Sequence, residues 1–283
     1  MQIGIFAKTF VRPSLAETLD AVAAHGIQQV QFNMACAGLP SMPDQIDSAL
    51  AATIRRELAA RSIAMAAVSG TFNIIHPDME QRRAGIRRLH VLAASCHQLG
   101  TALITLSTGT RDPENMWRRH AGNDTPAAWR DMIASLREMV KIAEDNAATL
   151  GIEPEISNVI DSAAKARRLL DEIGSPRLKI VMDGANLFHA GALARMREIL
   201  EEAFALLGSD IVLAHAKDLS RDGDAGHEAA GTGQLDYNLY LSLLRRVGYR
   251  GPLILHALAE EQVDPCVAFL RQKGAALDAQ VAG

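Results

Sequence analysis

The 283-residue sequence lacks most features of secreted, membrane-bound or nucleic-acid-binding proteins. Its three cysteines, Cys36, Cys96 and Cys266, have no paired spacing, which favours reduced thiols in a cytoplasmic protein. No apolar run approaches the length of a membrane span, and the first residues do not have the pattern of a signal peptide. Aromatic residues make up 4% of the chain and the formal net charge is -4. We therefore expect neither a membrane nor a nucleic acid as partner.

The sequence instead shows a regular alternation of short apolar runs and longer segments of helical periodicity. It predicts eight strands, at residues 2–6, 27–32, 63–68, 102–106, 151–156, 178–183, 211–215 and 252–256. It predicts eight helices between and after them, at residues 14–25, 44–61, 79–99, 126–150, 161–173, 192–207, 235–247 and 263–276. This pattern favours an α/β fold with one (β/α)8 TIM barrel domain over residues 1–283. An open, doubly wound sheet is the alternative.

The predicted strand 211–215 ends in an unusual way. Its apolar residues give way abruptly to a histidine, and a lysine and an aspartate follow within three residues. Strand alternation places Leu213, His215 and Lys217 on one face. Such an ending is unusual for packing and typical of a site at the carboxyl end of a barrel strand.

Three neighbouring strands end with polar residues too. Strand 151–156 carries Glu153 and Glu155 on one face, with Glu155 expected nearer the mouth of the barrel. The strands on either side of 211–215 end at Asp183 and His256. Because these strands are consecutive, their ends should form an arc at the mouth.

Two carboxylates and two imidazoles in one place suit a divalent metal ion. We expect Glu155, Asp183, His215 and His256 to bind one Mn²⁺, Zn²⁺ or Co²⁺ ion, because Ca²⁺ and Mg²⁺ prefer shells of oxygen atoms. Without a metal, Glu155 and Asp183 would be like charges in one cleft. The alternative is that each carboxylate only caps a loop or a neighbouring helix.

The motifs around these residues resemble the xylose isomerase-like barrel superfamily, in particular its sugar-phosphate isomerase/epimerase group. The similar segments are Pro154-Glu155, Val181-Met182-Asp183, His215-Ala216-Lys217-Asp218, Gly231-Thr232-Gly233-Gln234-Leu235-Asp236-Tyr237 and Gly248-Tyr249-Arg250-Gly251-Pro252. The resemblance implies a barrel in which a glutamate, an aspartate, a histidine and a final glutamate bind a divalent metal. It also implies that the two glutamates transfer a proton at a sugar carbon. Glu155, Asp183 and His215 match that set.

The chain departs from the family pattern at two positions. His256 stands where the final glutamate is expected, and Asn186 stands where sugar epimerases of this kind tend to have a histidine. A metal-bound histidine nitrogen has no free lone pair to accept a proton, so a different base is needed. Glu260, Lys217 and Asp218 are the candidates, although Glu260 also suits the first turn of a helix.

Substrate contacts are expected from three further residues. Arg221 lies where the family often has a substrate-binding arginine, Asn186 follows Asp183 closely, and His76 lies just beyond the third strand. For His76 and Arg221, an ordinary loop residue is an equally good explanation.

We therefore expect a metal-dependent isomerase or epimerase of a small sugar, keto-sugar or polyol derivative, acting by proton transfer next to a carbonyl. A lyase or dehydratase on a sugar acid or polyol and a non-catalytic sugar-binding barrel are the alternatives. A related barrel, the abasic-site endonuclease, is disfavoured because the chain is acidic and Ser107-Thr108 supplies no metal ligand on the fourth strand. The expected partner is a small carbohydrate-like substrate, and homo-oligomerisation is left open.

Overall fold

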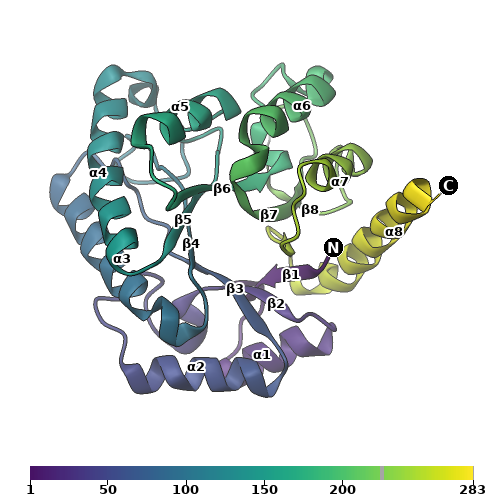
Figure 1. The fold of residues 1–283 in the computed structure, drawn as a ribbon, viewed down its shortest axis with the longest axis horizontal. Helices are drawn as coiled ribbons and strands as arrows, with labels where there is room; N and C mark the ends of the chain where they lie inside the picture. The colour runs from purple at the N-terminus through teal and green to yellow at the C-terminus, as the bar shows by residue number, and fades with distance from the viewer. Residues whose placement is uncertain (224–225, 283) are drawn as a thin grey trace.

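The computed structural model describes residues 1–223 and 226–282, except for the side chains of 280–282, and shows a closed parallel barrel surrounded by helices (Figure 1). The barrel strands are β1 (Ile3–Phe6), β2 (Gln29–Phe32), β3 (Ala64–Ser69), β4 (Leu103–Leu106), β5 (Thr149–Ile152), β6 (Leu178–Asp183), β7 (Ile211–Asp218) and β9 (Leu253–Leu255). Each pairs with the next, and β9 pairs with both β7 and β1. The closed circuit confirms the TIM barrel and excludes the open sheet.

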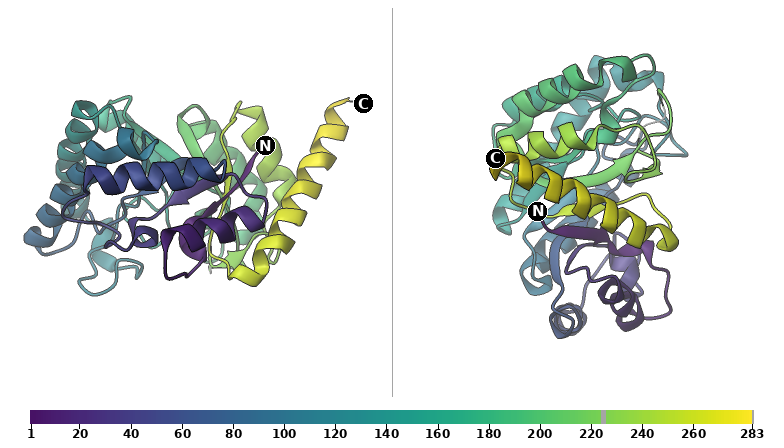
Figure 2. Two further views of the ribbon diagram at one scale, coloured as in Figure 1. Left: turned by 90° about the horizontal axis from the view of Figure 1, so that it is seen from below. Right: turned by 90° about the vertical axis from the view of Figure 1, so that its right-hand side faces the viewer.

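The helices lie outside the strands. They are α1 (Leu15–Ala24), α2 (Ser48–Ala60), α3 (Met79–Leu99), α4 (Pro126–Asp145), α5 (Ala163–Ile173), α6 (Met196–Leu207), α7 (Tyr237–Arg246) and α8 (Val263–Ala282). The end of α8 projects beyond the other elements (Figure 2). Among the described residues, no helix is long and apolar enough to cross a membrane. The cysteines form no disulfide.

Side-chain caps fix several helix starts close to where the sequence predicts them. Ser14 Oγ accepts a hydrogen bond from the backbone N–H of Glu17, and Asp78 Oδ1 accepts one from Glu80. Each cap satisfies a backbone donor that the first helical turn leaves without a partner. Because the caps set where each helix begins, they also set how each helix is placed against its strand.

The difference from the prediction that matters most for the site lies at β5. The sequence predicts a helix to residue 150 and a strand at 151–156, whereas α4 ends at Asp145 and β5 covers Thr149–Ile152. Ala147 takes a left-handed backbone conformation (φ 53°), which an α-helix cannot continue through. The strand begins two residues and ends four residues earlier than predicted, and Glu153 follows it directly.

The buried apolar residues form two layers. A small cluster lies inside the barrel, centred on Ala67, Leu103, Val181, Leu213 and Ile254, and a large one lies between the strands and the helices. Burying one such leucine or isoleucine contributes roughly 1.5–3 kcal/mol. The two clusters together fix the face that each barrel strand turns inward.

Strand β7 shows this division most clearly. Leu213 belongs to the inner cluster, whereas Ala214 and Ala216 belong to the outer one. His215 and Lys217 therefore share the inner face with Leu213, as the alternation predicts.

Candidate active site at the mouth of the barrel

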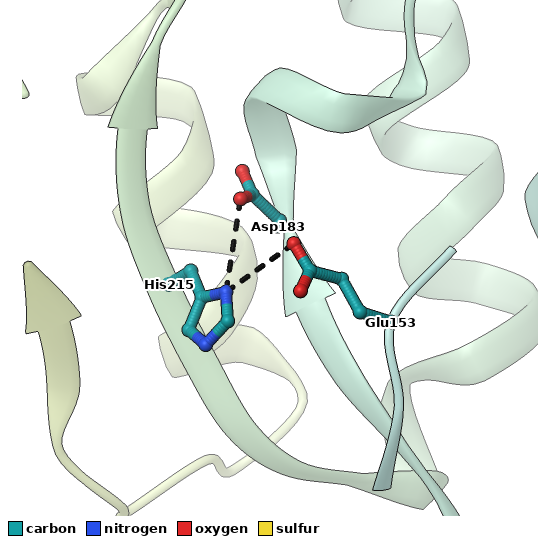
Figure 3. Close-up of side chains that lie close together, drawn as sticks. All are labelled: Glu153, Asp183 and His215. Carbon is teal, nitrogen blue, oxygen red and sulfur yellow. Dashed lines mark ion pairs between the residues drawn. The ribbon is translucent and has the colours of Figure 1, made fainter. Parts of the chain in front are cut away.

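Three neighbouring strand ends bring Glu153, Asp183 and His215 together (Figure 3). A register shift between β6 and β7 at Ile180/Val181 leaves Asp183 paired directly with His215. One ligand atom from each of the three side chains lies within 4.8 Å of the others. His215 Nδ1 is 3.3 Å from Glu153 Oε1 and 3.8 Å from Asp183 Oδ2.

The imidazole of His215 is held in place from its other side. Gln31 Oε1, on β2, lies 2.8 Å from His215 Nε2. An amide oxygen only accepts, so a hydrogen of the imidazole lies on Nε2. Nδ1 makes no hydrogen bond and points to the two carboxylates (Figure 3). Ligand histidines in metal sites are oriented through the second nitrogen in this way.

Lys217 provides the positive charge closest to the carboxylates. Its Nζ donates to Glu153 Oε1 at 2.9 Å and lies 2.9 Å from Asp183 Oδ2. Asn186 Nδ2 donates to the same Glu153 oxygen at 2.7 Å. The side chain of Lys217 is 8% exposed, so this ion pair is shielded from water.

These contacts shift the protonation equilibria of the site. Burial alone would raise the pKa of Glu153, but Lys217 and His215 outweigh it and hold the pKa well below its usual range. Burial lowers the pKa of His215 and of Lys217, but the neighbouring carboxylates more than compensate, so both pKa values are raised. The shifts of Glu153 and Lys217 both favour the ion pair between these two side chains.

His256 lies next to this group but is not part of it. Its ring stacks between Phe6, at a centroid distance of 4.6 Å, and His215, at 5.0 Å. Burial lowers the pKa of His256 well below its usual value, and the charges of Lys217 and His215 lower it further. The ring thus packs between Phe6 and His215, and its Nδ1 is buried without a hydrogen bond.

Glu153, not Glu155, takes the place expected for the strand-five carboxylate. The prediction placed Glu155 nearest the mouth because it extended the strand to residue 156, whereas β5 ends at Ile152. Glu155 Oε1 instead accepts a hydrogen bond from Ser157 Oγ at 3.0 Å. Burial raises the pKa of Glu155. The structure therefore separates the two glutamates, one beside Asp183 and one further out.

A cavity of about 350 Å³ opens above the group. Its wall includes Glu153, Glu155, Asn186, Lys217 and His256. Hydroxyl and amide groups line it as well, from Gln31, Asn33, Ser69, Thr71 and Thr105. The cavity offers many hydrogen-bonding groups to a small polar molecule.

Three residues expected to contact substrate or to act as a base lie elsewhere. Glu260 pairs with Arg12 at 2.5 Å on the surface, where both side chains are 33% exposed. His76 has both ring nitrogens engaged, with the carbonyl of Pro113 and the N–H of Asp78. Arg221 is exposed in the loop after β7. None of these three is among the residues that line the cavity.

Asp218 is also unsuited to act as a base, because backbone groups surround it. Its Oδ1 accepts hydrogen bonds from the N–H groups of Leu219 and Leu235, at 2.9 and 2.8 Å, and its Oδ2 accepts one from Gly231 at 3.0 Å. The carboxylate is 1% exposed. It anchors the loop between β7 and α7.

Sequence reasoning missed Gln31, whose side chain contacts His215. It lies on the buried strand β2 and is 3% exposed, so its amide is a buried polar group that needs a partner. The predicted strand contains Gln28, Gln29 and Gln31, so the sequence alone does not single out Gln31.

Comparison with known proteins identifies a family and a set of similar folds. The model of one family, described as xylose isomerase-like TIM barrel, matches residues 19–273. No curated protein matches the sequence at a significant level. A D-tagatose 3-epimerase-like protein shares 15% identity at a TM-score of 0.77, covering 99% of this chain and 100% of the other.

Two further solved structures are similar over nearly their whole length. The IOLI protein with a binding zinc atom shares 14% identity at a TM-score of 0.73, covering 99% of both chains. The 3-keto-D-glucoside 4-epimerase YcjR from E. coli shares 17% identity at a TM-score of 0.69, covering 96% of this chain and 99% of the other. At these identities the likeness shows the fold alone.

Proposed function

The chain belongs to the xylose isomerase-like TIM barrel family, and on that premise we propose that it is a divalent-metal-dependent isomerase or epimerase of a small sugar or keto-sugar. The observation that carries the proposal is the convergence of Glu153, Asp183 and His215 at the mouth of the barrel. The similar structures include a 3-keto-D-glucoside 4-epimerase and a protein with a bound zinc atom, which supports the same class of reaction.

The three side chains fit a divalent cation by their chemistry. Two carboxylate oxygens and an imidazole nitrogen suit Zn²⁺, Mn²⁺ or Co²⁺. His215 Nδ1 is buried and faces both carboxylates, at 3.3 Å from Glu153 Oε1 and 3.8 Å from Asp183 Oδ2, so one ion could contact all three side chains. Glu153, Asp183 and His215 would hold the ion. A bound divalent cation supplies Lewis-acid polarisation of a substrate carbonyl.

The cavity residues suit a polyhydroxylated substrate. Gln31, Asn33 and Thr105 can exchange hydrogen bonds with hydroxyl groups. Trp117, which is 52% exposed and lines the same cavity, offers a flat apolar surface to the carbon-bound hydrogens of a sugar ring.

Glu155 is the residue that we assign to proton transfer. It lines the cavity next to Glu153 but makes no contact with Asp183 or His215 in the described structure, so its carboxylate is available to a substrate carbon. Burial raises the pKa of Glu155, which makes its carboxylate a stronger base than an exposed one. Asn186 and Lys217 would keep Glu153 ionised and fixed.

The proposal is tested by incubating the protein with a panel of keto-sugars and 3-keto-glucosides in D₂O, with and without Mn²⁺, Zn²⁺ or Co²⁺. NMR should detect deuterium at the carbon next to a carbonyl, and chelation should stop the exchange until the metal is restored. Binding of these compounds without exchange would favour a non-catalytic sugar-binding barrel. Loss of water from the compound would favour a dehydratase.

A further inference from the structure

Lys217 lies between the two carboxylates that would hold the metal. Its Nζ is 2.9 Å from both Glu153 Oε1 and Asp183 Oδ2. These are the same two oxygen atoms that face His215 Nδ1. An ammonium ion and a divalent cation therefore have the same ligands available to them.

The charge balance of the site does not favour both cations together. Glu153 and Asp183 bring two negative charges, and the neighbouring imidazole of His256 brings none where the family pattern has a third carboxylate. A dication alone neutralises the pair. If Lys217 stayed between these two oxygens, its ammonium would repel the dication at short distance, which is costly where water is excluded.

The cavity gives the lysine a place to move. Lys217 lines the cavity, as does the carboxylate of Glu155, which is two residues beyond Glu153 and outside the metal-ligand group. A flexible four-carbon side chain can move its ammonium from one carboxylate to another without a change in the backbone.

We propose that Lys217 is a tethered counter-cation that occupies the carboxylate pair in the metal-free protein and must leave it before the metal binds. The inference rests on the proposed function, because it concerns the metal ligands of that same site. It predicts that Lys217 lowers the affinity of the site for divalent ions and stabilises the metal-free form. If only a fraction of the protein molecules have Lys217 away from the carboxylates, the apparent affinity for the metal is reduced by that fraction.

The test compares Mn²⁺ binding by the wild type, Lys217→Met and Lys217→Gln. Isothermal titration or the EPR signal of free Mn²⁺ gives the dissociation constant, and thermal unfolding with and without Mn²⁺ gives the stability of each form. The exposed Lys8, which lines the same cavity, supplies the control Lys8→Met for the general effect of removing a positive charge.

We expect Lys217→Met to bind Mn²⁺ about tenfold more tightly than the wild type. The dissociation constant of Lys8→Met should lie within about twofold of the wild-type value. Without metal, Lys217→Met should unfold at a lower temperature than the wild type. Mn²⁺ should raise the melting temperature of Lys217→Met by more than it raises that of the wild type. Lys217→Gln, whose amide can still donate to the carboxylates, should fold if the methionine variant does not and should also bind Mn²⁺ more tightly.

Two results would overturn the inference in distinguishable ways. Equal or weaker binding by both Lys217 variants, with binding by the wild type intact, would show that the lysine does not compete, while the proposed function would survive. If neither the wild type nor any variant binds Mn²⁺, Zn²⁺ or Co²⁺, the metal site and the inference fail together.

Discussion

The side chain of Gln31 on β2 accepts a hydrogen bond from His215 on β7, with 2.8 Å between Oε1 and Nε2. This contact crosses the barrel and joins residues that are 184 positions apart in the chain. It places the hydrogen of the imidazole on the side away from the carboxylates. The geometry of the proposed metal site therefore depends on a residue that does not bind the metal.

Gln31→Leu should weaken metal binding by about tenfold or more, because outer hydrogen-bond partners of ligand histidines typically contribute that much. The control is Gln29→Leu on the same strand, whose amide contacts Gln2 at the surface. Competition with a chromophoric chelator measures the affinities. Equal affinities for both variants and the wild type would show that Gln31 does not position His215.

Glu153→Gln and Glu155→Gln should separate metal binding from proton transfer. Glu153→Gln removes a ligand charge, so the purified protein should lose most of its bound metal. Glu155→Gln should keep the metal and lose deuterium exchange by about 100-fold or more, the usual contribution of a general acid or base. Elemental analysis and exchange by NMR test the pair, and metal loss in Glu155→Gln alone would reverse the assignment.

His256→Phe should retain the metal, because the ring of His256 stacks on Phe6 and His215 and lies outside the group formed by Glu153, Asp183 and His215. A phenyl ring can keep both contacts. His215→Phe is the matched variant and should lose metal binding. If His256→Phe loses the metal to the same degree, His256 is a ligand after all, as the sequence analysis expected.

Asp218→Asn should lower the free energy of unfolding by about 1–3 kcal/mol, because its amide nitrogen cannot accept the hydrogen bonds that the carboxylate receives from backbone N–H groups. The exposed Asp222 in the same loop supplies Asp222→Asn as control, with a smaller loss expected. Denaturant unfolding with metal absent measures both. Equal stabilities of Asp218→Asn and the wild type would contradict the anchoring role.

The barrel could be predicted from the sequence because its signals are local and repeated. Eight apolar runs separated by helical segments fix the strand count, and the alternation on β7 correctly placed Leu213, His215 and Lys217 on the inner face. Asp183 was expected beside His215, and the register of β6 and β7 places it there.

The finer geometry of the site could not be predicted in the same way. The choice between Glu153 and Glu155 depends on where β5 ends, which the alternation within the strand does not reveal. The contact of Gln31 with His215 joins distant parts of the chain, and no local pattern encodes it. Glu260 was chosen by its nearness in sequence to His256, whereas its carboxylate turns outward to Arg12.

The most direct test of this account is the anomalous scattering from a crystal of the protein grown with Mn²⁺. We expect one strong peak at the mouth of the barrel, with Glu153, Asp183 and His215 at about 2.0–2.3 Å from the ion. The ammonium of Lys217 should then lie away from the two carboxylates. The absence of an anomalous peak at the mouth of the barrel would contradict the account. So would an ion bound by other residues.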